Sequence, residues 1–287
     1  MLHTTLRRFC RSGVIRRHYA ELSDENSAIA QSLYSRKQIT EETVNEWKIK
    51  AICSTLQISL PQPPMALLPG WHQLFCLPTV PTSELSDDGY EADFAPPEPY
   101  IARMWGGSKL KWNIDPTTSK PHAIKVGDTL RKTTSVNNVV FKEGKKSGKL
   151  LILDLANQYT RVDDGKELLQ DNVSMIYRTQ PFAAPVNSDG RVHAQSNHKS
   201  HNDSLIAQPA ENPSKWTRTV RASSVLLFRY SALTFNAHMI HYDQSYSNSE
   251  GFQNTLVHGP LQAQLLLDHV NRIFPGRGIS SFSYRGK

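Results

Sequence analysis

Cysteine is scarce in this chain of 287 residues, which has three, Cys10, Cys53 and Cys76. They form neither a CxxC pair nor a dense framework, so a disulfide scaffold and a zinc ribbon are both excluded as fold classes. We therefore expect free thiols in a reducing compartment. Long apolar runs are also missing. No stretch of about eighteen apolar residues occurs, so the sequence predicts no membrane-spanning helix.

Acidic residues are absent from the first twenty positions, and the first one is Glu21. The same segment carries five of the positive charges behind the formal net charge of +7, namely Arg7, Arg8, Arg11, Arg16 and Arg17. The rest of the chain is only weakly basic, so the high pI is no argument for nucleic-acid binding. An Arg-rich, acid-free start predicts a mitochondrial presequence over residues 1–20, and hence a location in the mitochondrial matrix. A disordered basic tail is the alternative.

Residues 21–60 are predicted to be helical, because Val44, Trp47 and Ile52 recur at helical spacing opposite charged positions. Residues 61–100 are rich in proline, and no periodicity runs through them. This second stretch is therefore predicted to be a long irregular loop.

Alternating and β-branched residues take over further along the chain and predict strands. The predicted strands cover residues 109–114, 130–141, 150–162 and 168–177. The last two flank Asp163-Asp164-Gly165, a turn typical of a hairpin. Residues 183–214 are polar and poor in aromatics, so we interpret them as a linker. Residues 225–230 (VLLFRY) and 280–284 are predicted as two further strands.

A helix is predicted to start at the tripeptide His258-Gly259-Pro260, because proline at the first helical position has no N–H to leave unpaired. Residues 261–274 (LQAQLLLDHVNRIF) are apolar nearly all round, which is typical of a fully buried helix. Pro275-Gly276 is expected to end it.

A polar turn, FNAHMIH at residues 235–241, precedes this helix and carries Asn236 and His241 five residues apart. The turn resembles the signature D-x-N-P-[LIV]-H of MaoC-like dehydratases. The final histidine and the aliphatic residue before it match, and Asn236 replaces the aspartate. The longer segments RYSALTFNxHxIHYD and VHGPL, with Asp88-Gly89 and RMWGGS upstream, resemble one subfamily more closely. It contains fungal mitochondrial 3-hydroxyacyl-thioester dehydratases type 2 and bacterial mesaconyl-CoA-type hydratases.

This resemblance implies an α+β fold, a double hotdog in which an antiparallel sheet wraps around a central helix. The implied parts are a presequence (1–20), an N-terminal helix with a non-catalytic hotdog (21–182), the linker (183–214) and a catalytic hotdog (215–287). The family pattern would continue beyond Tyr284, so we expect the second hotdog to be incomplete at its C-terminus.

The implied enzyme is a hydro-lyase that converts (3R)-hydroxyacyl thioesters to trans-2-enoyl thioesters in mitochondrial type II fatty-acid synthesis. His241 is the expected acid–base group, because the ordinary pKa of histidine lies near neutral pH. Asn236 is expected to position the substrate hydroxyl or a water. The expected substrate-binding residues are His258, Gly259, Pro260 and His238. The N–H of Gly259 would meet the thioester carbonyl at the positive end of the helix. No cofactor or metal is implied.

Several roles stay open in this reading. His238 could replace the missing carboxylate, and Asp243 could either orient a histidine or begin a helix. The HxxH spacing of His238 and His241 could hold zinc with His258 or Asp243 as a further ligand. His72 could be catalytic, although a lone histidine beside a tryptophan is more often structural.

The substrate and the partners also stay open. The expected carrier is acyl carrier protein or coenzyme A, with basic residues such as Arg103 and Arg229 near the pocket mouth, and a homodimer is an expected assembly. A first alternative is a hydratase of a branched C4 or C5 dicarboxylyl-CoA, which an arginine in the pocket, paired with the free carboxylate, would mark. A long apolar tunnel would instead mark fatty-acyl substrates. A second alternative is a non-catalytic hotdog protein that binds acyl thioesters.

Overall fold

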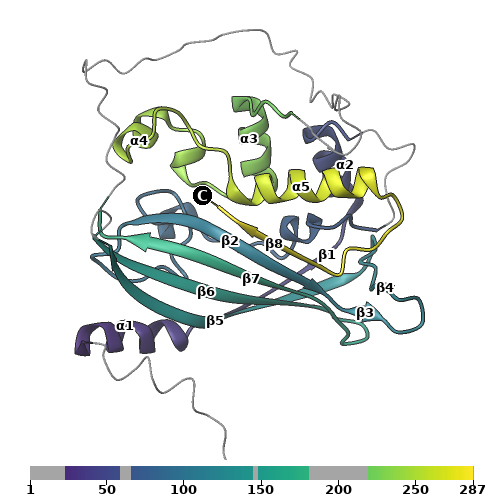
Figure 1. The fold of residues 1–287 in the computed structure, drawn as a ribbon, viewed down its shortest axis with the longest axis horizontal. Coiled ribbons are helices and arrows are strands. Elements are labelled where there is room, and N and C mark those ends of the chain that lie inside the picture. The colour runs from purple at the N-terminus through teal and green to yellow at the C-terminus, as the bar shows by residue number, and fades with distance from the viewer. Residues whose placement is uncertain (1–22, 59–65, 145–147, 181–218, 287) are drawn as a thin grey trace, which may run out of the picture.

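One antiparallel sheet forms the centre of the fold (Figure 1). The computed structural model describes residues 23–58, 66–144, 148–180 and 219–286 of the chain. The strands of the sheet lie in the order β1-β5-β6-β7-β2-β8. They are β1 (Lys37–Thr43), β5 (Thr129–Gly144), β6 (Gly148–Arg161), β7 (Glu167–Arg178), β2 (Ala102–Trp112) and β8 (Ser281–Arg285). A small ribbon pairs β3 (Ile114–Asp115) with β4 (Lys120–Pro121). The predicted presequence and linker lie outside the described residues.

Most of the predicted strands are confirmed. Residues 130–141, 150–162 and 168–177 belong to β5, β6 and β7, and residues 280–284 correspond to β8. β6 and β7 pair antiparallel across the predicted hairpin turn. β2 starts earlier than predicted, at Ala102, and contains a bulge between Trp105 and Gly107.

The continuous helix predicted over residues 21–60 is wrong. Two helices, α1 (Asp24–Tyr34) and α2 (Glu46–Thr55), are separated by β1, whose burial alternates residue by residue. The predicted apolar face is confirmed at Val44 and Ile52, which are buried, but it is wrong at Trp47, which is 69% exposed while Ile49 is buried. The side chain of Asn45 caps α2 by accepting a hydrogen bond from the N–H of Lys48. The helix therefore starts later than the hydrophobic spacing indicated.

The strand predicted over residues 225–230 is also wrong, because this stretch lies in α3 (Ser224–Leu233). The hydroxyl of Ser223 accepts a hydrogen bond from the N–H of Leu226 at 3.2 Å and caps the helix. Its buried residues are Leu226, Leu227, Tyr230 and Leu233. This spacing is helical, but an apolar run of six residues does not by itself distinguish a strand from a buried helix.

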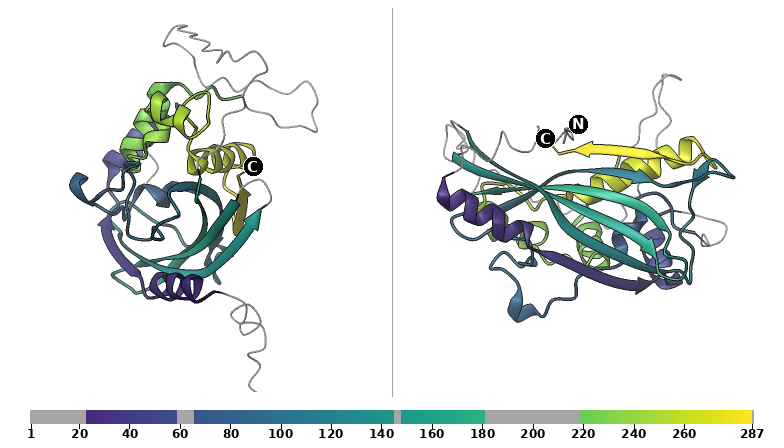
Figure 2. Two further views of the ribbon diagram at one scale, coloured as in Figure 1. Left: turned by 90° about the vertical axis from the view of Figure 1, so that its left-hand side faces the viewer. Right: turned by 90° about the horizontal axis from the view of Figure 1, so that it is seen from below.

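Two hydrophobic cores form at opposite ends of the strands. One combines α2, α3, α5 (Gly259–Ile273) and the short 3-10 helix η2 (Trp71–Leu74) with residues such as Leu130 and Tyr159. The other joins Ile29 and Leu33 of α1 to Leu151 on β6. The sheet curves strongly, and α2, α3 and α5 lie together on the side toward which it curves (Figure 2). In Figure 1, α1 lies at the far end of the sheet from α2.

Helix α5 begins and ends where the sequence predicts. It starts at Gly259 with Pro260 in its first turn, and it ends at Ile273, just before Pro275-Gly276. The segment that follows leads into β8, which pairs antiparallel with β2 at the edge of the sheet. The second half of the chain therefore adds a strand to the sheet that the first half builds.

The prediction that α5 is buried on all sides is wrong. Leu266, Val270 and Phe274 are 45%, 37% and 48% exposed, and they recur at every fourth residue. Leu261 and Leu267 lie on the buried side. Helix α5 is thus covered on one side by the described residues, because it lies across β2 at one edge of the sheet. Within the described residues, no helix is long and apolar enough to cross a membrane.

Candidate active site

The predicted catalytic turn and the start of α5 line one cavity of about 550 Å³. Helix α3 leads into the turn, the 3-10 helix η4 (Met239–His241) forms its end, and α4 (Gln244–Ser249) follows. The predicted site residues on the cavity wall are Asn236, His238, His241, Gly259 and Pro260. The fold therefore brings both predicted motifs to one place, although the turn and the helix start are separate in sequence.

His241 is held in one tautomer. Its Nδ1 atom lies 2.8 Å from the carbonyl oxygen of Leu256, so Nδ1–H donates and Nε2 keeps its lone pair. Burial lowers the pKa of His241 to about 4, and the hydrogen bond to Leu256 offsets this only in part. The ring is therefore neutral near pH 7, and Nε2 can accept a proton.

The imidazole ring of His258 packs against the ring of His241. The two rings stack with centroids 3.6 Å apart and planes 18° apart. Nε2 of His258 lies 2.8 Å from the hydroxyl oxygen of Ser231, and the residue is buried. Burial, with His241 beside it, lowers the pKa of His258 to about 2. His258 was predicted to bind substrate, but it lies beneath His241 and does not line the 550 Å³ cavity.

Asn236 presents its amide nitrogen rather than its oxygen. The oxygen Oδ1 accepts the backbone N–H of His238 at 3.0 Å, which closes a local turn. The NH₂ group is the part of the side chain left to donate to a ligand. Phe235, directly before it, has a φ of 50°, a left-handed conformation that is uncommon for a bulky residue.

The start of α5 offers a backbone donor at the cavity wall. The first N–H groups of a helix have no partner within the helix, and Pro260 has no N–H, so Gly259 supplies the donor nearest the wall. A Cβ atom on Gly259 would lie 2.2 Å from the indole ring of Trp105. Glycine is therefore required here by the close approach of Trp105, apart from any role in binding.

A buried charge network holds the turn at residues 235–241. This network was not predicted from the sequence. Nε2 of His238 lies 3.2 Å from Oδ2 of Asp88, and Nε of Arg103 lies 2.6 Å from the same oxygen. Burial alone would raise the pKa of Asp88, but the hydrogen bond from His238 and the charge of Arg103 hold it below its ordinary value. The expectation that Arg103 is a surface residue for a carrier protein is wrong, because its side chain is buried against Asp88.

The Asp88-Gly89 turn also holds the catalytic turn through its backbone. The carbonyl of Asp88 accepts the N–H of Met239 at 2.8 Å. Gly89 has a φ of 82°, and a Cβ atom there would lie 2.3 Å from the carbonyl oxygen of Ala237. The sequence marked Asp88-Gly89 only as a segment of a resemblance, because nothing local indicates contact with a turn so far along the chain.

Asp243 and His72, whose roles the sequence left open, both lie in structural positions. Asp243 is the N-cap of α4, where its carboxylate accepts the N–H of Tyr246 at 2.9 Å, so it begins a helix and does not orient a histidine. His72 is buried away from His241, with Nε2 3.4 Å from Asp171. In the described part of the chain, no three His, Cys, Asp or Glu side chains are grouped to hold a metal ion.

The curved antiparallel sheet brings the first turn of α5 and the neutral His241 to one cavity, an arrangement suited to a hydro-lyase of the hotdog fold. The chain belongs to the family described as hydroxyacyl-thioester dehydratase type 2, whose model matches residues 70–287. The resemblance to MaoC-like dehydratases is thereby confirmed.

Relatives and solved structures agree with this family. A mesaconyl-C(4)-CoA hydratase of Chloroflexus aurantiacus is 34% identical over 224 residues, which cover 77% of this chain and 70% of that protein. A mitochondrial hydroxyacyl-thioester dehydratase type 2 of Schizosaccharomyces pombe is 25% identical over 240 residues, covering 77% of this chain and 73% of that one. A solved MaoC-like dehydratase superposes with a TM-score of 0.57 at 12% identity, over 90% of this chain and 83% of that chain. The predicted α+β hotdog fold is confirmed.

Proposed function

We propose that this chain interconverts (3R)-hydroxyacyl thioesters and trans-2-enoyl thioesters, with His241 as the acid–base group. The observation that carries the proposal is the single cavity lined by His241, Asn236 and the start of α5. A neutral histidine, an amide donor and a helix N-terminus are the groups that this elimination needs. The cavity volume of about 550 Å³ lies in the range usual for small-ligand sites.

The thioester carbonyl binds at the N–H of Gly259, where the helix dipole stabilises the negative charge that develops on the oxygen. Nε2 of His241 takes the proton from C2, and the electron pair of that C–H bond forms the C2–C3 double bond. The C3–O bond breaks, and the hydroxyl leaves as water with the proton that His241 carries. Both proton movements occur on one face of the substrate. The amide of Asn236 donates to the hydroxyl oxygen and holds it in place.

His238 is a second candidate for the proton that goes to the hydroxyl. It lines the cavity, and Asp88 lies 3.2 Å from its Nε2. The contact with Asp88 orients the imidazole of His238 at the cavity wall, and histidine is a side chain that can carry a proton in acid–base catalysis. In this version His241 removes the C2 proton and His238 protonates the leaving hydroxyl.

Two finer assignments follow the two relatives. Mitochondrial type II fatty-acid synthesis, in the matrix and on acyl carrier protein or coenzyme A, is supported by the mitochondrial fungal relative and by the Arg-rich, acid-free start of the chain. Hydration of a dicarboxylyl-CoA is supported by the bacterial relative. The two substrates differ at the far end of the acyl group, which is a methyl in the first and a carboxylate in the second.

The test is hydration of trans-2-butenoyl-CoA, followed by loss of the enoyl absorbance, with the wild type, His241→Ala, Asn236→Ala and His122→Gln. We expect activity in the wild type, a loss of about 10²–10⁴-fold in His241→Ala and a smaller loss in Asn236→Ala. His122 lies near Asp115 and the β3–β4 ribbon, so His122→Gln is the matched control and keeps full activity. A folded wild type that binds the thioester without turnover would contradict the enzyme proposal and support a binding protein.

A further inference from the structure

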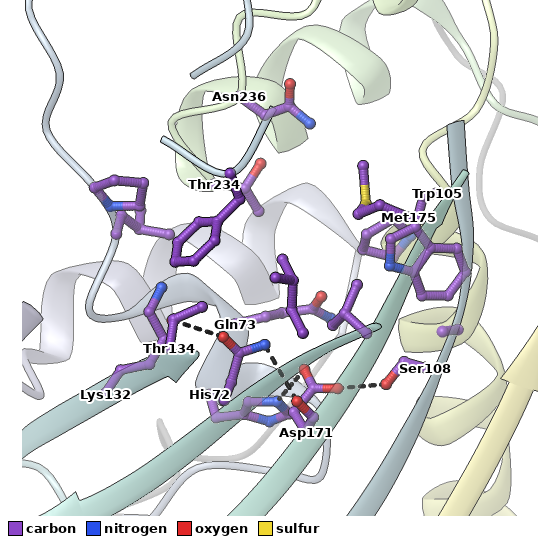
Figure 3. Close-up of a pocket in the computed structure, with 18 of the residues that line it drawn as sticks. His72, Gln73, Trp105, Ser108, Lys132, Thr134, Asp171, Met175, Thr234 and Asn236 are labelled. Carbon is purple, nitrogen blue, oxygen red and sulfur yellow. Dashed lines mark hydrogen bonds and ion pairs between the residues drawn. The ribbon is translucent and has the colours of Figure 1, made fainter. Parts of the chain in front are cut away.

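A second cavity adjoins the first and leads away from His241. Its volume is about 210 Å³, and it shares Trp105, Met175, Asn236 and Pro260 with the cavity described above. Figure 3 shows Asn236 on one side of it, and Ser108 and Asp171 on the opposite side. A thioester whose carbonyl lies at Gly259 has its acyl group directed past Asn236. We call this second cavity the acyl chamber.

The end wall of the acyl chamber is polar and rigid. Ser108 donates a hydrogen bond to Oδ1 of Asp171, and His72 lies 3.4 Å from Oδ2 of the same carboxylate. The amide of Asn157 donates to the backbone carbonyl of Asp171 at 3.2 Å and accepts from Thr134 at 2.7 Å. These residues hold one another, so the wall cannot easily rearrange to admit a longer alkyl chain. An alkyl end would also cover the polar wall without replacing its contacts with water.

Lys132 gives the chamber a cation that lies near acidic side chains, Glu91 first among them. It projects from β5 and is the sole lysine or arginine among the described residues that line the chamber (Figure 3). Of the ion pairs and hydrogen bonds found among described residues, none involves its Nζ. Burial lowers the pKa of Lys132, and the nearby carboxyl of Glu91 offsets part of that effect. An ammonium group in such a partly buried cavity is stabilised when an anion joins it.

The two acidic residues that line the chamber, Asp171 and Glu91, leave the positive charge of Lys132 available to a ligand. Asp171 is engaged by Ser108 and lies beside His72. Burial raises the pKa of Glu91 to about 7, so near neutral pH much of this side chain is an uncharged acid that can itself donate a hydrogen bond. Glu91 and Lys132 both line the chamber, and an uncharged Glu91 leaves Lys132 to pair with a carboxylate ligand.

We propose that the acyl chamber recognises an acyl group ending in a carboxylate, with Lys132 as its ion-pair partner. The proposal rests on the proposed function, since it takes the thioester to lie at Gly259. It assigns the chain to short acyl groups with an acidic end and excludes long saturated ones. Lys132 is then a specificity-determining residue rather than a catalytic one.

The test compares two trans-2-enoyl-CoA thioesters of six carbons, one ending in a methyl and one in a carboxylate. We expect a higher kcat/KM for the carboxylate-ended substrate in the wild type. Lys132→Met should lower the ratio of the two kcat/KM values about tenfold or more, mainly through KM, and Lys132→Arg should keep much of it. Lys111, an exposed residue of β2, gives the matched control Lys111→Met, which should leave the ratio unchanged.

An unchanged ratio in Lys132→Met, or a wild type that favours a ten-carbon alkyl substrate, would overturn the proposal. If no thioester is turned over, the proposed function fails instead. The chamber is then judged by calorimetry with the saturated, carboxylate-ended CoA thioester. Weaker binding by Lys132→Met supports the chamber assignment, and equal binding by both proteins overturns it.

Discussion

The imidazole rings of His241 and His258 lie face to face, with their centroids 3.6 Å apart. A single proton on either ring would place a cation against its neighbour in a buried site, so both rings are held neutral. The orientation of His241 depends on this stack and on the carbonyl of Leu256, which fixes its Nδ1–H. In the proposed mechanism, His258 therefore positions the acid–base group His241 and does not itself contact the substrate.

Removal of the hydroxyl of Ser231 should slow the reaction through this stack. Ser231→Ala leaves Nε2 of His258 buried without its partner, so we expect kcat to fall about tenfold while KM changes little. Ser231→Thr keeps a hydroxyl and should recover much of the rate. Steady-state kinetics with trans-2-butenoyl-CoA measure both values. A rise in KM at constant kcat would show that Ser231 contacts substrate instead.

Acidification should destabilise the protein before most carboxylates titrate. The pKa values of His241 and His258 are lowered to about 4 and about 2, whereas in the unfolded chain both histidines titrate near ~6.5. Between these values the unfolded state binds more protons, so the free energy of unfolding falls as pH falls. We expect a loss on the order of 1–2 kcal/mol per histidine between pH 7 and pH 5, measured by urea unfolding. His258→Phe should show a smaller loss over the same interval, and an equal loss would contradict the assignment.

Asp88→Asn should destabilise the fold more than an exposed ion pair can. It leaves the buried Arg103 without its carboxylate, for which about 3–5 kcal/mol is expected. Glu41→Gln removes an exposed partner of Arg131 and should cost under about 1 kcal/mol. Because the pKa of Asp88 is held low, its contribution is present at neutral pH and is lost only as pH falls through that low value. Equal unfolding free energies for the two variants would contradict this role.

Asn236→Asp should keep activity that Asn236→Ala loses. One carboxylate oxygen can still accept the N–H of His238, and the other replaces the amide with the acid that the MaoC-like signature carries at this position. We expect the variant to keep at least about a tenth of the wild-type kcat/KM and to gain an ionisation in its pH–rate profile. The protonated carboxyl can donate in place of the amide, so activity should rise as pH falls through the new ionisation; a variant as inactive as Asn236→Ala at every pH would contradict the prediction.

The sequence predicted the parts of the fold whose signals are local. The tripeptide at residues 258–260 placed the start of α5, and alternation placed β5, β6 and β7. The prediction failed where two periods compete. The strand β1 is short and lies between two helices, and the apolar run inside α3 fits either period. Burial of α5 was overestimated because composition does not reveal which side of a helix another element covers.

The sequence predicted the residues proposed to act on the substrate, but not the residues that hold them in place. His241, Asn236 and Gly259 were identified from a turn and a helix start, and they line one cavity. Asp88 was given no role and Arg103 was expected near the pocket mouth, because the contacts of Asp88 with His238 and Arg103 arise only after distant strands and loops have packed. Lys132 carried no signal at all, since a single lysine in a predicted strand is usually on the surface.

The Asp88-Gly89 turn connects the first half of the chain to the proposed site. That half has neither a catalytic turn nor a helix start of the HGP kind, yet it supplies the carbonyl that holds Met239 and the carboxylate beside His238. In the proposed mechanism, substitutions of Asp88 would therefore displace Met239 and His238 and alter turnover. Two residues of the same site thus depend on a position about 150 residues earlier in the chain.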